Sequence, residues 1–218
     1  MTRLIRYLLA LLVRSQGYVA PALLFAATLV VLTTNDQGPL PATYSASAMA
    51  LFICMTWLTV ALVNAEDHTQ RSMTRVAAGS LRRVVVACVL GAGVIAAVLM
   101  LIGLGYPLLA GKHTVTGTAL AVGVLAQLVA ALTGIAIGLL CSRLVLRRAG
   151  HAVLVAIGLI GVLLLVPRVP PIAPMMRLLS SARRSETMLG PLVVLAAAAL
   201  AILLVSVVAT HVVARRQE

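Results

Sequence analysis

Uncharged runs of apolar residues recur along the whole chain, and they constrain its fold more than any other feature. A bilayer's hydrocarbon core is about 30 Å thick and takes roughly 20 apolar residues as helix. Lipid cannot satisfy bare backbone N–H and C=O groups, so each spanning run must be helical. We therefore expect an all-α membrane protein with six transmembrane helices. The candidate spans are residues 17–34, 47–64, 84–106, a run within 114–142, 152–166 and 188–210.

The composition supports lipid as the main solvent. Of the 218 residues, 62% are hydrophobic and 10% are charged, whereas a soluble domain has about 25% charged residues. The formal net charge is +12. In a membrane protein, topology and anionic inner-leaflet lipid account for such an excess of arginine. We therefore expect membrane lipid, and no nucleic acid, as a partner.

The N-terminal segment, residues 1–16, has the pattern of an amphipathic helix. A helical projection places Arg3, Arg6, Tyr7, Ala10 and Arg14 on one face, with apolar residues over the rest. A basic helix of this kind lies in the membrane interface. A cleaved signal peptide is the alternative, but Arg14 ends its apolar run early and a full span follows.

Basic residues indicate the orientation. They gather at both ends of the chain, in the loop after the second run and in the loop after the fourth, whereas the loop 35–46 has none. The positive-inside rule then makes both termini cytoplasmic and the protein multi-pass. One loop departs from the rule, because it is predicted to be external and yet is basic. It contains Arg168, Arg177, Arg183 and Arg184.

Ionisable groups are missing from the spans. The acidic residues lie outside the apolar runs, whereas ion-driven carriers keep such groups at membrane depth. Cys54, Cys88 and Cys141 show no paired spacing, and the histidines show no metal-ligand spacing. We therefore expect no catalytic, metal or cofactor site in this chain. Gln127 is the strongest polar group within a span, as either a hydrogen-bonding partner between helices or a substrate ligand.

The loop between the second and third runs, residues 65–83, is the most informative polar segment. Glu66 and Asp67 suit the N-terminus of a short helix over residues 68–76. Gly79 is expected to end that helix, and Ser80 to cap the third span. The segment is either a solvated loop whose arginines set topology or a docking helix for a cytoplasmic partner.

In this layout the chain resembles the permease subunits of ABC-2 type (type V) exporters. The segment Glu66-Asp67-His68-Thr69-Gln70-Arg71, with the Gly79–Arg83 stretch before the third span, is similar to that family's coupling-helix region. The proline-rich stretch 167–174, in which we expect no regular helix, resembles its outer re-entrant connection, here 167–187. The six-span domain would then cover residues 17–216.

The resemblance implies a function and partners. The chain would be the permease subunit of a bacterial plasma-membrane exporter, a homodimer or a heterodimer with a similar permease. ATP and Mg would bind a separate ABC ATP-binding subunit. The substrate would be hydrophobic or amphiphilic: a drug, lipid or peptide. The alternative is a non-transporting scaffold or accessory subunit of a membrane complex.

Two sets of residues are candidates for these roles, and small residues are candidates for helix packing. The expected contacts with the ATP-binding subunit are Glu66, Asp67, His68, Arg71 and Arg75. The possible substrate pathway comprises Phe25, Met55, Trp57 and Gln127. Close packing of helices is expected at Ala130, Gly134 and Gly138, and at Gly158 and Gly161, although glycines are also simply common in membrane helices.

Overall fold

The computed structural model describes residues 1–33, 40–66, 70, 73–74, 79–110, 116–143, 149–166, 170–181 and 185–216. Within these residues the regular structure is entirely helical, which confirms the all-α expectation. The helices are α1 (Thr2–Arg14), α2 (Val19–Thr33), α3 (Leu40–Asn64), α5 (Leu81–Ala110), α6 (Gly117–Leu140), α7 (Ala149–Leu165), α8 (Ile172–Ser180) and α9 (Ser185–Arg216).

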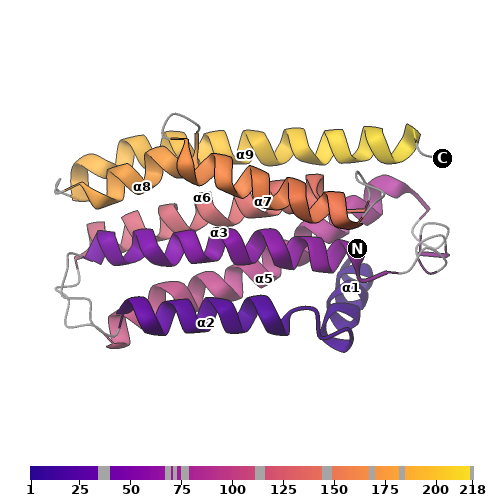
Figure 1. Ribbon diagram of the computed structural model, residues 1–218, viewed down its shortest axis with the longest axis horizontal. Helices are drawn as coiled ribbons and strands as arrows, with labels where there is room; N and C mark the ends of the chain where they lie inside the picture. The colour runs from indigo at the N-terminus through magenta and orange to yellow at the C-terminus, as the bar shows by residue number, and fades with distance from the viewer. Residues whose placement is uncertain are drawn as a thin grey trace.

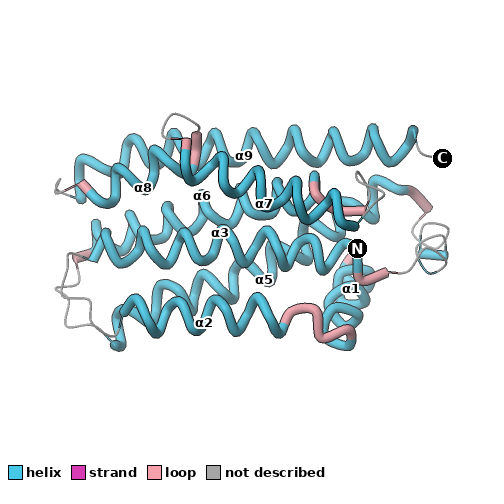
Figure 2. The backbone as a smooth tube through the Cα atoms, viewed as in Figure 1, coloured by secondary structure: helices cyan, strands magenta, loops and turns pink. Residues whose placement is uncertain are grey.

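The long helices lie side by side along the long axis of the molecule, and α1 crosses one end of the bundle (Figure 1). The described residues at both ends of the chain lie toward that same end, together with the end of α3 and the start of α5. Figure 2 shows that the described loop residues lie toward the ends of the bundle and at the start of α8. We call the end that carries α1 the α1 end.

Among the described residues, four helices are long and apolar enough to cross a membrane: α3, α5, α6 and α9. A fifth span is counted if α1 and α2, which meet at an 80° bend, are taken together. The apolar part of α7, Leu154–Leu165, is shorter than a span. A multi-pass membrane protein with four to five candidate spans is thus established, and six spans remain a prediction.

The outer faces of the bundle are apolar, as lipid contact requires. Long aliphatic side chains on α2, α5, α7 and α9 are exposed, and they include Leu23, Val31, Leu101, Ile157, Leu165, Val194 and Val205. Soluble monomers rarely expose contiguous apolar patches of more than a few hundred Å². The surface therefore agrees with the composition in making lipid the solvent of these faces.

The core of the bundle is the contact between α3 and α6, which run in the same direction. A Cβ atom built on Gly134 would lie 2.8 Å from the carbonyl oxygen of Phe52, and one on Gly138 would lie 2.8 Å from that of Thr56. At these two positions the backbones of α3 and α6 therefore lie closer together than a residue with a Cβ atom on α6 would allow. The predicted packing role of Gly134 and Gly138 is confirmed.

The two α7 glycines behave differently. A Cβ atom on Gly158 or Gly161 would meet nothing within 4 Å. These glycines do not mediate close packing within the described part of the chain. The spacing of small residues thus predicted close helix packing correctly in α6 but not in α7.

The N-terminal helix has the predicted amphipathic character. Arg3, Arg6, Tyr7, Ala10 and Arg14 are all exposed, whereas Leu8 and Leu12 are buried against the bundle. The chain turns after Arg14, where Gln16 adopts a positive φ of 54°. This turn sets α1 across the end of the bundle instead of along it.

The proline-rich segment corrects one expectation. No regular helix was expected over 167–174, but α8 begins at Ile172 and contains Pro174. Proline is tolerated there because it lies in the first turn, where the missing N–H has no intrahelical acceptor. The expectation that proline excludes regular helix applies to helix interiors and not to the first turn. Ile172, Met175 and Leu179 are buried, so α8 packs into the bundle.

Candidate functional site

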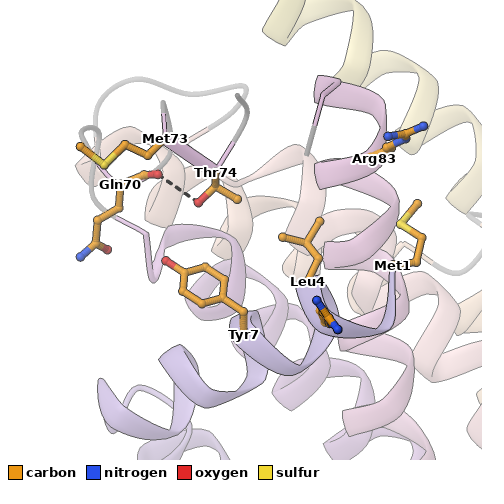
Figure 3. A pocket seen from close by; sticks show the side chains of 8 residues that line it. Met1, Leu4, Tyr7, Gln70, Met73, Thr74 and Arg83 are labelled. Atoms are coloured by element: carbon orange, nitrogen blue, oxygen red, sulfur yellow. Dashed lines mark hydrogen bonds between the residues drawn. The ribbon is translucent and has the colours of Figure 1, made fainter. Parts of the chain in front are cut away.

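The connection between α3 and α5 is fastened to the α1 end of the bundle by an internal hydrogen bond. Glu66, just after α3, is 4% exposed, and its Oε1 accepts a 2.8 Å hydrogen bond from the Thr74 hydroxyl. The Thr74 hydroxyl also lies 3.0 Å from the carbonyl oxygen of Gln70 (dashed in Figure 3). Thr74 is thereby held against the end of α3.

The same end of α3 is also tied to α6. The Asn64 side-chain oxygen accepts a 3.0 Å hydrogen bond from the backbone N–H of Arg143, beyond the end of α6. The last residue of α3 therefore bonds toward α6, and Glu66 bonds toward the connection. A displacement of the connection would act on both core helices through these two bonds.

The far end of the connection enters α5 as predicted. Gly79 has a φ of 72°, in the left-handed region that favours glycine. The Ser80 hydroxyl accepts a hydrogen bond of 3.4 Å from the backbone N–H of Arg83, which is the geometry of an N-terminal helix cap. The connection is thus anchored to α3 at one side and capped onto α5 at the other.

A cavity of about 830 Å³ opens between α1, this connection and the first turn of α5. Figure 3 shows side chains from all three segments around it. Two arginines line it, together with apolar and uncharged polar side chains. The lining residues are Met1, Arg3, Leu4, Tyr7, Gln70, Met73, Thr74 and Arg83. The described lining residues thus combine two arginines with apolar and uncharged polar side chains.

The expected ATPase contacts fall partly outside the described structure. Asp67, His68, Arg71 and Arg75 are not among the described residues. Glu66 is described, and its carboxylate is turned inward to Thr74 and not outward to a partner. Of the short helix expected over 68–76, the described positions Gln70, Met73 and Thr74 are helical.

The expected substrate-pathway residues do not form one site. Phe25 on α2 and Gln127 on α6 come together around Gly103 of α5, where an added Cβ would lie 3.3 Å from Phe25 Cζ and 2.8 Å from Gln127 Nε2. Met55 is buried at Gly134, deeper in the α3–α6 contact. Trp57 is 49% exposed on the outer side of α3.

Gln127 makes a bond that its sequence position alone did not specify. Its Nε2 donates a 2.7 Å hydrogen bond to the Ser47 hydroxyl on α3, and both side chains are buried. Its Oε1 is buried without a protein partner among the described residues. The hydrogen-bonding role between helices is therefore confirmed, and the open acceptor leaves the substrate role untested.

A second cavity opens on the side of the bundle. It has a volume of about 490 Å³, lies between α2, α3 and α8, and is almost wholly apolar. Leu24, Met49 and Met176 contribute one wall each. It has the character of a groove that faces lipid, and none of the described residues that line it is charged.

The described residues offer little other reactive chemistry. No group of three or more His, Cys, Asp or Glu side chains among them is placed to hold a metal ion. Burial raises the pKa of the Cys141 thiol, directly after α6, to about 11, so it stays protonated at neutral pH. The thiolate is the nucleophilic form, so Cys141 is a packing residue.

The sequence analysis did not predict the hydrogen bonds of Thr74 and Ser47. It also did not predict that Arg3 and Arg83 line the same cavity. Thr74 had a weak signal, as the polar residue that follows Gln70 by one helical turn. Ser47 and the arginine pair had none, because their contacts join distant parts of the chain. Searches for related proteins do not extend this description: no model of a known protein family matches the chain, and no curated protein matches it.

Proposed function

We propose that the chain is the permease subunit of an ATP-driven exporter of the ABC-2 type. It would move a hydrophobic or amphiphilic substrate, using a separate ATP-binding subunit that docks at the α1 end. The observation that carries the proposal is the Glu66–Thr74 hydrogen bond. It fixes the connection to the end of α3, so that force applied to the connection reaches the membrane helices.

The packing of α3 supports this role. A movement of Glu66 would be transmitted to α3, which packs closely against α6 at Gly134 and Gly138. Force arriving at Gly79 and Ser80 enters the capped first turn of α5. The connection therefore has one attachment to α3 and one to α5. A rigid route from connection to core is what an external motor requires.

The residue composition of the two core helices also favours an energy source on a partner subunit. No acidic or basic residue lies within α3 or α6, the two core helices. An ion-driven carrier keeps ionisable groups at membrane depth. The chain therefore lacks the usual means of coupling to an ion gradient in its core, and ATP hydrolysis on a partner is the better-supported source.

Six passes are part of the proposal. Figure 1 shows α7 and α8 following one another along the bundle, toward the end where α9 begins. We assign them together as one interrupted span, broken at the prolines. With α2 and the four long helices this gives six passes, and both termini lie on the cytoplasmic side of a bacterial plasma membrane.

Co-purification tests the assignment. The chain would be co-expressed with the ATP-binding subunits of its own genome, each tagged in turn, and extracted in mild detergent. We expect one such subunit to be retained in equal amount with the chain. Retention of none of them, with the bundle intact by circular dichroism, would contradict the proposal and favour a membrane scaffold or accessory subunit.

A further inference from the structure

The cavity of about 490 Å³ on the side of the bundle, which we call the side groove, lies between α2, α3 and α8. Because α3 contacts both α2 and α8, it forms the floor. Small side chains make up much of that floor, among them Ala46 and the buried Ala50 and Cys54. They leave space along this face of α3 that larger side chains would fill.

The chemistry of the lining suits hydrocarbon. None of the described residues that line the groove is charged. The Thr28 hydroxyl donates a 2.7 Å hydrogen bond to the carbonyl oxygen of Leu24, and the Ser180 hydroxyl donates one of 3.2 Å to that of Arg177. Both donors are thus used within their own helices. Burying a polar group without a partner is costly, so the groove favours an apolar occupant over a polar one.

The side groove is elongated along the bundle. On α3 its lining extends from Ala42 to Cys54, which is about 18 Å of helix at a rise of about 1.5 Å per residue. One leaflet is half of a hydrocarbon core of about 30 Å, or about 15 Å. Ala42 lies near the start of α3, at the end of the bundle away from α1 (Figure 1). The groove therefore follows one leaflet from that end of the bundle toward its middle.

The side groove is continuous with the surface that faces lipid. Leu24 and Leu32 line it and are themselves 44% and 41% exposed. Their neighbours on α2, Leu23 and Val31, belong to the exposed aliphatic surface of the bundle. An acyl chain of the surrounding bilayer can therefore enter the groove sideways without leaving the hydrocarbon core.

We propose that the side groove binds one acyl chain of a membrane phospholipid, in the leaflet on the side away from α1. Met49 on α3 and Met176 on α8 both line the groove. Their unbranched thioether side chains adapt to an occupant of variable shape. A bound chain would add apolar contacts between α2, α3 and α8. This inference does not depend on the proposed transport function.

The test uses the full chain in phosphatidylcholine vesicles that contain a trace of phosphatidylcholine with a photoactivatable diazirine in the middle of one acyl chain. After illumination, peptide mass spectrometry locates the cross-linked residues. Ala46→Phe fills the groove from α3, and Thr28→Phe fills it from α2. Ala27→Phe is the matched control, because Ala27 is exposed on α2 and does not line the groove. Circular dichroism checks that each variant keeps its helical content.

We expect more cross-links to Met49 and Met176 than to Leu101, which is 72% exposed on α5 and has only ordinary bilayer lipid beside it. Each filling variant should lower the groove cross-links about tenfold, the factor for lost contact with about two methylene groups. The control should change them less than about twofold, as surface substitutions do.

Two results would overturn the proposal. Groove cross-links that are no more frequent than those to Leu101, or that persist in both filling variants, would mean that the groove holds no particular chain. Cross-links to Leu101 with none in the groove would favour a second copy of the protein as the occupant. The comparison within the parent chain decides between these results even where a filling variant fails to fold.

Discussion

The Gln127 side chain on α6 donates a 2.7 Å hydrogen bond to the Ser47 hydroxyl on α3, inside the bundle. Interhelical hydrogen bonds in membranes average about 0.6 kcal/mol. Replacing Gln127 by Leu removes this bond and also removes the buried acceptor that has no described partner. These effects oppose one another, so we expect a change of less than about 1 kcal/mol in the free energy of unfolding.

The measurement is unfolding by SDS titration in mixed micelles, followed by circular dichroism. Ser47→Ala is the control, because it removes the bond and leaves the whole amide unpaired, and it should destabilise more than Gln127→Leu. A large loss of stability in Gln127→Leu would mean that the bond outweighs the open acceptor. In reconstituted vesicles, altered substrate-stimulated turnover with unaltered stability would instead assign Gln127 to the substrate pathway.

The contact between α3 and α6 should be intolerant of even one added methyl group. In Gly138→Ala the new Cβ would lie 2.8 Å from the carbonyl oxygen of Thr56, and backbone atoms cannot move aside as a flexible side chain can. Overpacking of this kind costs about 1–3 kcal/mol of unfolding free energy. Thermal unfolding in detergent measures the loss.

Gly161→Ala is the matched control, since an added Cβ there meets nothing within 4 Å. Alanine has the higher helix propensity by up to about 1 kcal/mol, so this variant should be as stable as the parent or slightly more stable. Equal destabilisation by the two substitutions would show that the close approach at Gly138 is not what holds α3 to α6.

Much of this fold follows from the sequence because apolar periodicity and length are local signals. The runs 47–64 and 84–106 correspond to α3 and α5, although both helices extend further. The extension of α3 to Leu40 was missed because Thr43 and Ser45 appear polar in sequence, yet both are buried in the bundle. The Ser80 cap was predicted correctly, since helix starts also have local signals, and Gly79 has the left-handed φ that suits a helix end, although the expected end of the 68–76 helix lies outside the described residues.

The site was less predictable because its contacts join distant segments. The inward turn of Glu66 depends on Thr74, and nothing in the spacing of a short loop specifies which way a carboxylate points. The cavity at the α1 end depends on the turn at Gln16, which brings Arg3 to the start of α5. An 80° bend between helices leaves no periodic pattern in the sequence. The sequence therefore did not predict that Arg3 and Arg83 line the same cavity.

The orientation predicts a labelling pattern in intact cells on a cysteine-free background. Thr69→Cys and Arg216→Cys should react only with reagents that reach the cytoplasm, because arginine-rich segments are retained there. Arg177→Cys on the exposed side of α8 should react with an impermeant reagent from outside. Labelling of Arg177→Cys from the cytoplasm alone would show that α7 and α8 do not together complete a span.

The Glu66–Thr74 bond should matter for coupling more than for folding. Thr74→Val keeps the shape of the side chain and removes the donor, so the connection loses one fastening to α3. We expect lower substrate-stimulated ATP hydrolysis in reconstituted complexes, with assembly unchanged. Thr74→Ser keeps the donor and should restore the stimulation. If serine rescues nothing, the hydroxyl has no part in coupling.

The most direct test of the account asks whether the connection transmits ATP hydrolysis to the membrane helices. Asp67→Ala with Arg71→Ala removes one acidic and one basic residue from the connection. Glu218→Ala with Arg215→Ala removes the same pair of charges near the end of the chain and serves as the control. Truncating one member of a desolvated charge pair weakens an interface by about 2–5 kcal/mol.

The measurement is substrate-stimulated ATP hydrolysis by the complex in reconstituted vesicles. The account predicts that the connection variant loses the ATP-binding subunit or its stimulation, while the control variant keeps both and both chains retain their helical content. Unchanged assembly and unchanged stimulation in the connection variant would contradict the assignment of residues 65–83 as the coupling element.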